Sequence, residues 1–124
     1  MRKNKKISLL FLFSILLMTL FGCGQSSLAK VDILTRIEET PKIFWGVKND
    51  TRLFGLTNIE TRKVEGFDID IALAITEEIL GPEGEAVFVE VTSKTRIPLI
   101  KNGNIDAIIA TMTISEERLK QVDF

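Results

Sequence analysis

The chain has 124 residues, of which 45% are hydrophobic and 27% are charged, a composition typical of a globular protein. Residues 1–22 carry four basic and no acidic side chains, whereas residues 23–124 carry 12 Lys and Arg against 17 Asp and Glu. An acidic body argues against nucleic acid as a partner. Because the sequence has no His and a single Cys, it excludes His-based catalysis, His metal ligation and a disulfide framework within this chain.

The first 22 residues have the pattern of a bacterial export signal. A cationic start precedes an apolar run of about 15 residues, shorter than the ~20 that a membrane-spanning helix needs. Leu20-Phe21-Gly22-Cys23 then resembles the lipobox of bacterial lipoproteins. We therefore predict a signal peptide over 1–22, lipidation of Cys23, and a location at the outer face of the cytoplasmic membrane or in the periplasm. The alternative is an uncleaved N-terminal anchor with a buried cysteine.

The remaining sequence alternates between helical and strand patterns. Apolar spacing and cap residues predict helices over 29–39, 67–80, 93–102 and 115–122. Short apolar runs predict buried strands over 42–48, 86–91 and 105–111. Between the first strand and the second helix, residues 49–66 are predicted to form a loop with a small hairpin whose tip is 57–63. This order indicates an α/β fold, a parallel sheet with helices on both faces.

The helix over 67–80 is predicted to face the core with a stripe formed by Ile71, Ile75 and Ile79. Ile69, Leu73 and Leu80 would widen that stripe. Asp68 is expected to cap the start of this helix or to complement its dipole.

Ligands of parallel α/β sheets bind outside the carboxyl ends of the strands, which places three loops at the expected site. In the first loop, Lys48 can attract an anion, Asp50 an ammonium group, and Phe54 can form a wall. In the second, Arg96 lies in the first turn of a helix, where the dipole disfavours a cation, and this hints at an anionic partner. The alternative for each is a solvated polar loop, with Phe54 in the core.

The third loop holds Thr111, Thr113 and Arg118 around the start of a predicted helix. Free N–H groups, two hydroxyls and a guanidinium suit the α-carboxylate of an amino acid. The alternative is that Thr113 only caps the helix and Arg118 pairs with Glu117 or solvent. No nucleophile–base pair, paired carboxylates or glycine-rich phosphate loop stands out, so the chain is interpreted as a binding protein rather than an enzyme, without cofactor or metal.

From Ile43 to Phe124 the chain resembles the first part of the polar amino-acid-binding proteins of ABC importers, the bacterial extracellular solute-binding proteins of family 3. Five segments carry the resemblance in family order: Gly46-Val47, Glu65 to Ala72, Ser93 to Leu99, Asn102 to Asp106, and Thr111 to Arg118. Thr111 stands where some relatives carry Gly or Ser.

The resemblance implies the type II periplasmic-binding-protein fold, in which two α/β lobes close on a ligand. Residues 42–124 would form the N-terminal part of the first lobe, after a tether and short helix over 23–41, and the second lobe would be absent. Because the resemblance assigns the group that neutralises the ligand ammonium to that second lobe, we expect the segment to bind an amino acid poorly or not at all on its own.

The resemblance also implies the roles of the site residues. Thr111, Thr113 and Arg118 would hold the α-carboxylate of glutamine, glutamate or aspartate. Arg96 and Lys48 would reach an acidic side chain, and Asp50 would matter more for glutamine. Ser93, Phe54 and Ala110 complete the candidate ligand-binding set.

The expected partners are a free polar amino acid, the permease subunits of an ABC importer, and the membrane through the lipid. Two other classes stay open: an enzyme on the same fold, such as a dehydratase or a cell-wall lyase, and a receptor ectodomain.

Overall fold

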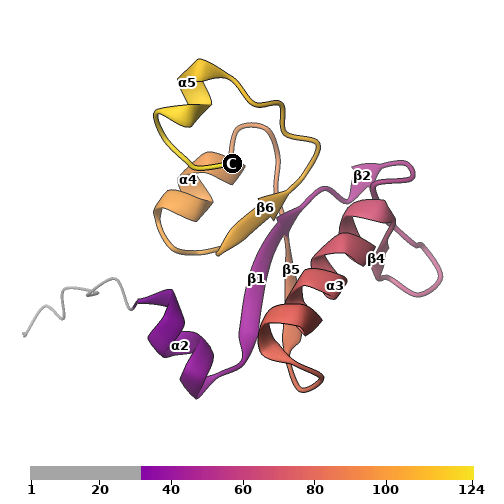
Figure 1. Ribbon diagram of the computed structural model, residues 1–124. Coiled ribbons are helices and arrows are strands. Elements are labelled where there is room, and N and C mark those ends of the chain that lie inside the picture. The colour runs from indigo at the N-terminus through magenta and orange to yellow at the C-terminus, as the bar shows by residue number, and fades with distance from the viewer. Residues whose placement is uncertain (1–31) are drawn as a thin grey trace, which may run out of the picture.

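The computed structural model describes residues 32–124 (Figure 1). The predicted export signal, Cys23 and the first residues of the predicted N-terminal helix lie outside this range. Within it, no helix has both the length and the apolar character that crossing a bilayer requires. The elements in chain order are α2 (Ile33–Glu39), β1 (Lys42–Val47), β2 (Asp50–Thr51), β3 (Gly55–Thr57), β4 (Val64–Glu65), α3 (Phe67–Leu80), β5 (Glu85–Glu90), α4 (Arg96–Lys101), β6 (Ala107–Ile109) and α5 (Glu116–Leu119).

The main sheet has the strand order β5-β1-β6, with both pairs parallel, as predicted. β1 pairs along its whole length with β5, from Lys42 opposite Glu85 to Val47 opposite Glu90. β6 is shorter than predicted and pairs only from Ala107 to Ile109. Ile105 and Ala110, at the ends of the predicted run, are buried without belonging to the ladder, so their apolar character reflects packing rather than strand pairing.

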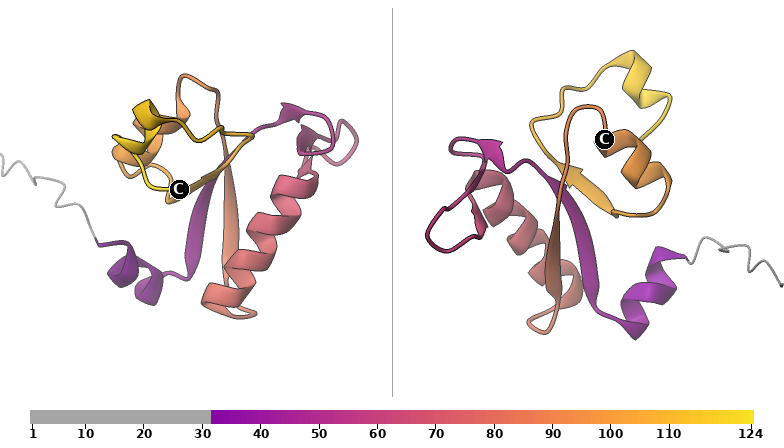
Figure 2. Two further views of the ribbon diagram at one scale, coloured as in Figure 1. Left: turned by 45° about the horizontal axis from the view of Figure 1, so that its top comes forward. Right: turned by 180° about the vertical axis from the view of Figure 1, so that it is seen from behind.

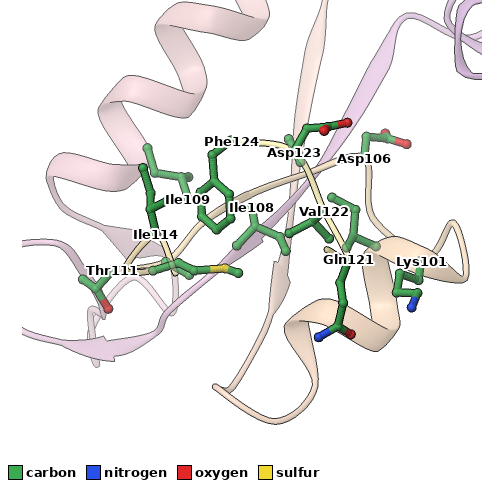
Figure 3. Close-up of a pocket in the computed structure, with 14 residues that line it drawn as sticks. Lys101, Asp106, Ile108, Ile109, Thr111, Ile114, Gln121, Val122, Asp123 and Phe124 are labelled. Carbon is green, nitrogen blue, oxygen red and sulfur yellow. The ribbon is translucent and has the colours of Figure 1, made fainter. Parts of the chain in front are cut away.

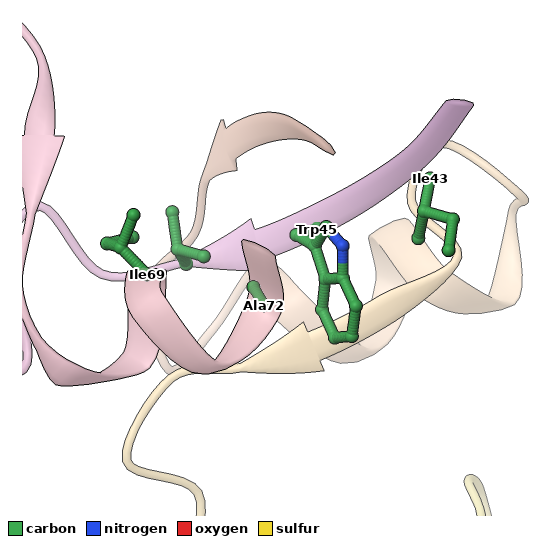
Figure 4. Close-up of a cluster of buried hydrophobic side chains, with 5 residues drawn as sticks. Ile43, Trp45, Ile69 and Ala72 are labelled. Carbon is green, nitrogen blue, oxygen red and sulfur yellow. The ribbon is translucent and has the colours of Figure 1, made fainter. Parts of the chain in front are cut away.

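Alternate residues of β1 face the two sides of the sheet. On one side Ile43, Trp45 and Val47 pack against Ile69 and Ala72 of α3 (Figure 4). On the other side Phe44 packs with a second cluster that includes Ile105 and residues of α4. α3 and α4 therefore lie on opposite faces of the sheet, as Figure 2 shows from two sides. This confirms the prediction of a sheet covered on both faces.

The buried stripe of α3 differs from the predicted one. Asp68, Ala72 and Thr76, which follow one another at intervals of four, are buried together with Ile69. Ile75 and Ile79 of the predicted stripe are 39% and 61% exposed. The polar Thr76 is tolerated inside because its hydroxyl accepts from Trp45 Nε1 at 2.8 Å and donates to the Ala72 carbonyl at 2.8 Å. Ile71 is half-buried, so of the predicted core-facing isoleucines only Ile69 is fully buried.

The segment between β1 and α3 forms a small antiparallel sheet in the order β2-β3-β4. The connection from β3 to β4 falls at the predicted tip. Gly66 then turns the chain into α3 with φ of 140°, and a Cβ at this position would lie 2.5 Å from the Phe54 carbonyl oxygen. Only glycine fits this turn, which brings the start of α3 against the first loop.

The last two helices are shorter than predicted. A turn from Thr92 to Thr95 precedes α4, in which the Thr92 backbone N–H donates to Thr95 Oγ1 at 2.9 Å. α5 has four residues, and Ser115 rather than Thr113 caps it, with its Oγ accepting from the Arg118 N–H at 3.3 Å. Asp68 is likewise not a cap, because Gly66 occupies the N-cap position of α3 without a side-chain bond.

Candidate functional site

Three loops gather at one end of the main sheet, where the carboxyl ends of β1, β5 and β6 lie (Figure 1). The first follows β1 and contains Lys48, Asp50 and Phe54. The second, after β5, contains Ser93 and leads into Arg96. The third follows β6 and runs from Ala110 to Arg118. This edge of the sheet holds all the candidate ligand-binding residues that the sequence indicated.

The third loop begins with an unusual backbone. Thr111 has φ of 48°, in the left-handed region that a β-branched residue rarely adopts. Such a conformation costs on the order of 1–3 kcal/mol and persists only where surrounding contacts hold it. Thr111 and Thr113 are exposed, so their hydroxyl groups are accessible to a ligand. The left-handed φ also gives a physical reason why glycine suits this position.

Arg118 lies against the same loop, with Nη1 donating to the Thr113 carbonyl oxygen at 2.6 Å. Its side chain reaches back along the loop instead of pairing with Glu117. Because α5 has only four residues, its dipole contributes little to anion binding. The capacity of this loop to hold a carboxylate therefore depends mainly on the guanidinium and the two threonines.

Arg96 is 4% exposed, and its Nη1 donates to the Ala110 carbonyl at 2.9 Å. Its buried Nε has no hydrogen-bond partner. Burial lowers the pKa of the Arg96 guanidinium from its ordinary value, and the positive charge of Arg118 lowers it further. Within residues 32–124, neither arginine forms an ion pair with a carboxylate. Two neighbouring positive charges without a counter-ion favour an anionic ligand.

In the first loop the two charged candidates pair with each other. Lys48 Nζ lies 2.8 Å from Asp50 Oδ1, and this hydrogen bond is the main cause that lowers the pKa of the Asp50 carboxyl. A ligand group that used either charge would have to compete with this pair. Phe54 is partly exposed and meets Phe67 edge-on, with ring centroids 6.4 Å apart, so it can still form a wall. Ser93 is exposed in the second loop.

Asp68 belongs to this edge of the sheet and was not among the predicted site residues. It is 5% exposed, and its Oδ2 is buried without a partner. Burial raises the pKa of the Asp68 carboxyl, while the Thr111 backbone N–H, acting as a hydrogen-bond donor to it, works in the opposite direction. The signal in the sequence was an acid in line with Ala72 and Thr76, at helical spacing on the buried face.

An open groove of about 840 Å³ lies beside β6, between this strand and the C-terminal segment (Figure 3). It reaches Ala110 and Thr111 but not Thr113, Arg96, Arg118 or the first loop. Its lining is largely aliphatic, which does not suit a zwitterion, so the polar surface of the third loop is the better candidate site. No cluster of potential metal ligands occurs among residues 32–124.

Comparison with known proteins identifies the family. Residues 43–124 match the model of the bacterial extracellular solute-binding proteins, family 3. The chain belongs to this family. The ABC transporter glutamine-binding protein GlnH of Bacillus subtilis is 53% identical over 129 residues, which cover 100% of this chain and 47% of that protein. A glutamine-binding protein of Geobacillus stearothermophilus is 58% identical over 96 residues, or 77% of this chain and 37% of that protein.

The chain thus spans less than half of the length of these relatives, which are binding proteins and not enzymes. Among solved structures, the arginine-bound form of domain 1 from TmArgBP aligns with a TM-score of 0.61 at 32% identity, over 68% of this chain and 64% of that one. This match confirms the periplasmic-binding-protein fold. That structure is of a single domain with arginine bound.

Proposed function

We propose that the chain carries the carboxylate-binding part of a glutamine site, in an exported protein that delivers this amino acid to an ABC importer. One observation carries the proposal: the Arg118 guanidinium and the hydroxyls of Thr111 and Thr113 share one loop, beside a second arginine, and in the described part of the chain neither arginine forms an ion pair with a carboxylate. Glutamine is the ligand because the two relatives at 53% and 58% identity are named for it.

In this proposal Arg118 holds the α-carboxylate, and the threonine hydroxyls fix its orientation. The first and second loops surround the side chain of the ligand, with candidates Lys48, Asp50, Phe54, Ser93 and Arg96. Ala110, at the start of the third loop, is the remaining candidate. Residues 42–124 act as part of the first lobe of a two-lobed protein, and this agrees with the finding that the whole chain spans less than half of the length of its relatives.

The proposed setting is the outer surface of the cytoplasmic membrane. Lipidation of Cys23 together with removal of residues 1–22 would anchor the chain, and 23–41 would connect the lipid to the lobe. Incorporation of labelled palmitate into the protein, and its loss in Cys23→Ser, would support this anchor. Equal labelling of both proteins would contradict it.

Calorimetric titration tests the ligand. In a protein that includes the second lobe, L-glutamine should bind, whereas L-glutaminamide, in which a neutral amide replaces the α-carboxylate, should bind about 100-fold more weakly or not at all. Glutamate and aspartate serve as competitors that report the selectivity for the side chain. Equal affinities for glutamine and glutaminamide would contradict the proposed role of the third loop.

A further inference from the structure

Two buried side chains converge on a single peptide group at the end of β6. Arg96 Nη1 donates to the Ala110 carbonyl at 2.9 Å. The carboxyl of Asp68 is buried on the other side, and the backbone N–H of Thr111 is the neighbouring group that lowers its pKa. The carbonyl of Ala110 and the N–H of Thr111 belong to the same peptide group. This group is trans, so its C=O and N–H point in opposite directions.

The two side chains come from opposite sides of the sheet. Asp68 lies at the start of α3, which covers the face formed by Ile43 and Trp45. Arg96 begins α4, whose residues pack on the opposite face. An acceptor on one face and a donor on the other can therefore hold both polar groups of the peptide at once.

We infer that Asp68 and Arg96 are positioning residues that hold the Ala110–Thr111 peptide group from opposite faces, and thereby set the direction of the ligand-binding groups of the third loop. The inference deepens the proposed glutamine site and rests on it. It explains why a β-branched residue keeps φ of 48° at the point where the strand ends. It also explains why an acid and an arginine, both at least 95% buried, do not form an ion pair.

The start of α3 also connects the third loop to the first. The backbone N–H groups of Phe67 and Asp68 donate to the carbonyls of Leu53 and Phe54, at 2.8 and 2.9 Å. Asp68 thus joins two loops of the site, through its own N–H on one side and its carboxylate on the other. A change at Asp68 should disturb ligand binding without removing any group that touches the ligand.

Glutamine affinities of single and double variants, measured in a protein that includes the second lobe, test the inference. Asp68→Ala and Arg96→Met should each weaken binding about tenfold, and the double variant should lose less than the product of the two, because both act on one peptide group. Asp68→Asn, whose amide oxygen can accept from Thr111, should stay within about threefold of the parent. Asp70→Asn on the exposed face of α3 and Lys101→Met at the end of α4 are matched controls that should leave affinity unchanged.

A substitution at Thr111 distinguishes a positioning role of Asp68 from a general loss of stability. In a Thr111→Gly background the left-handed backbone is intrinsically allowed, so Asp68→Ala should cost clearly less than in the parent. Equal costs in both backgrounds would overturn the inference. Glutamate provides the second check on Arg96: positioning predicts similar losses for glutamine and glutamate in Arg96→Met. A loss confined to glutamate would instead assign Arg96 to the ligand side chain.

NMR tests the same contact without a ligand. The Thr111 amide proton should shift with pH as Asp68 ionises, and this titration should disappear in Asp68→Asn while Asp70→Asn retains it. A folded parent protein whose Thr111 amide shows no such titration would overturn the inference. If the titration is present but the protein that includes the second lobe does not bind glutamine, the proposed ligand is wrong and the positioning contact stands.

Discussion

Both ends of the parallel sheet carry an aspartate and an arginine, but the two ends use them differently. At the amino end, Arg36 of α2 pairs directly with Asp106, with Nη2 and Oδ2 2.5 Å apart. The same oxygen accepts from the Phe44 N–H at 2.8 Å, and the guanidinium lies over the Phe44 ring, 5.1 Å from its centroid. At the carboxyl end, Asp68 and Arg96 do not pair, and each keeps a buried polar atom without a partner.

This difference separates a structural contact from one that prepares a site. The amino-end pair satisfies its own groups and joins α2 to the start of β1 and to the chain before β6. At the carboxyl end, Asp68 and Arg96 lie against the backbone of a loop, and each has a buried polar atom without a hydrogen-bond partner. Such an atom lowers the free energy of unfolding, so we expect it to be kept only where it serves function. Substitutions at the amino end should therefore change stability, and substitutions at the carboxyl end should change affinity.

The largest expected effect is on binding, from Arg118→Met. This change removes the guanidinium that faces the proposed α-carboxylate, and we expect glutamine affinity to fall by about 100-fold or more. The free energy of unfolding should change little, because within residues 32–124 the Arg118 side chain makes a single exposed hydrogen bond, to the Thr113 carbonyl. Calorimetric titration and urea denaturation measure the two quantities. An Arg118→Met protein that loses stability but keeps its affinity for glutamine would show that this end of the sheet has a structural role instead of a binding role.

Asp106→Ala should produce the opposite result. It removes the carboxylate that accepts from Arg36 Nη2 and from the Phe44 N–H. The Arg36 side chain is 28% exposed and that of Asp106 is 11% exposed, so water replaces the lost acceptor only in part. We expect a loss of about 2–3 kcal/mol in the free energy of unfolding, with unchanged glutamine affinity. Asp106→Asn keeps an acceptor for Phe44 and should lose about half as much. A tenfold loss of affinity in either variant would contradict the separation of the two ends.

The same contrast shows what the sequence could and could not predict. Apolar runs and caps predicted the order of strands and helices, because these depend on local spacing. They did not predict the buried face of α3, where Asp68 and Thr76 are inside and Ile79 is outside, since that choice depends on partners such as Trp45 and Thr111. The role of Asp106 escaped prediction for the same reason: its partner Arg36 is 70 residues away in the chain.

The sequence was more informative about the site than about its supports. Thr111, Thr113 and Arg118 lie together because they are neighbours in one short segment. Arg96 drew attention as a cation at a helix start, but its bond to the Ala110 carbonyl could not be read from spacing. The left-handed φ of Thr111 could not be predicted from the sequence either, since a threonine side chain does not favour that conformation.

The buried carboxyl of Asp68 should give stability a characteristic pH dependence. Its pKa is raised in the folded state, mainly by burial, so the folded protein binds this proton more tightly than the unfolded chain does. The contribution to stability is therefore complete below the unfolded pKa of about 3.9 and is lost as pH rises toward the folded value. Asp68→Asn removes this dependence, so its stability relative to the parent should improve as pH rises from about 4. A constant difference between the two across this range would contradict the raised pKa.

The smallest effect is expected for Lys42→Met at the amino end. Lys42 Nζ lies 2.6 Å from Glu85 Oε2, nearly as close as Arg36 lies to Asp106, but these side chains are 39% and 56% exposed. Solvent screens such a pair, so we expect a change of at most about 0.5 kcal/mol in the free energy of unfolding, reduced further by 1 M salt. Asp106→Ala, measured in the same buffers, should keep most of its loss. If the two variants were equally destabilised, contact distance and not burial would determine the energy of these pairs. In that case the burial of the unpaired atoms of Asp68 and Arg96 would no longer indicate a functional site.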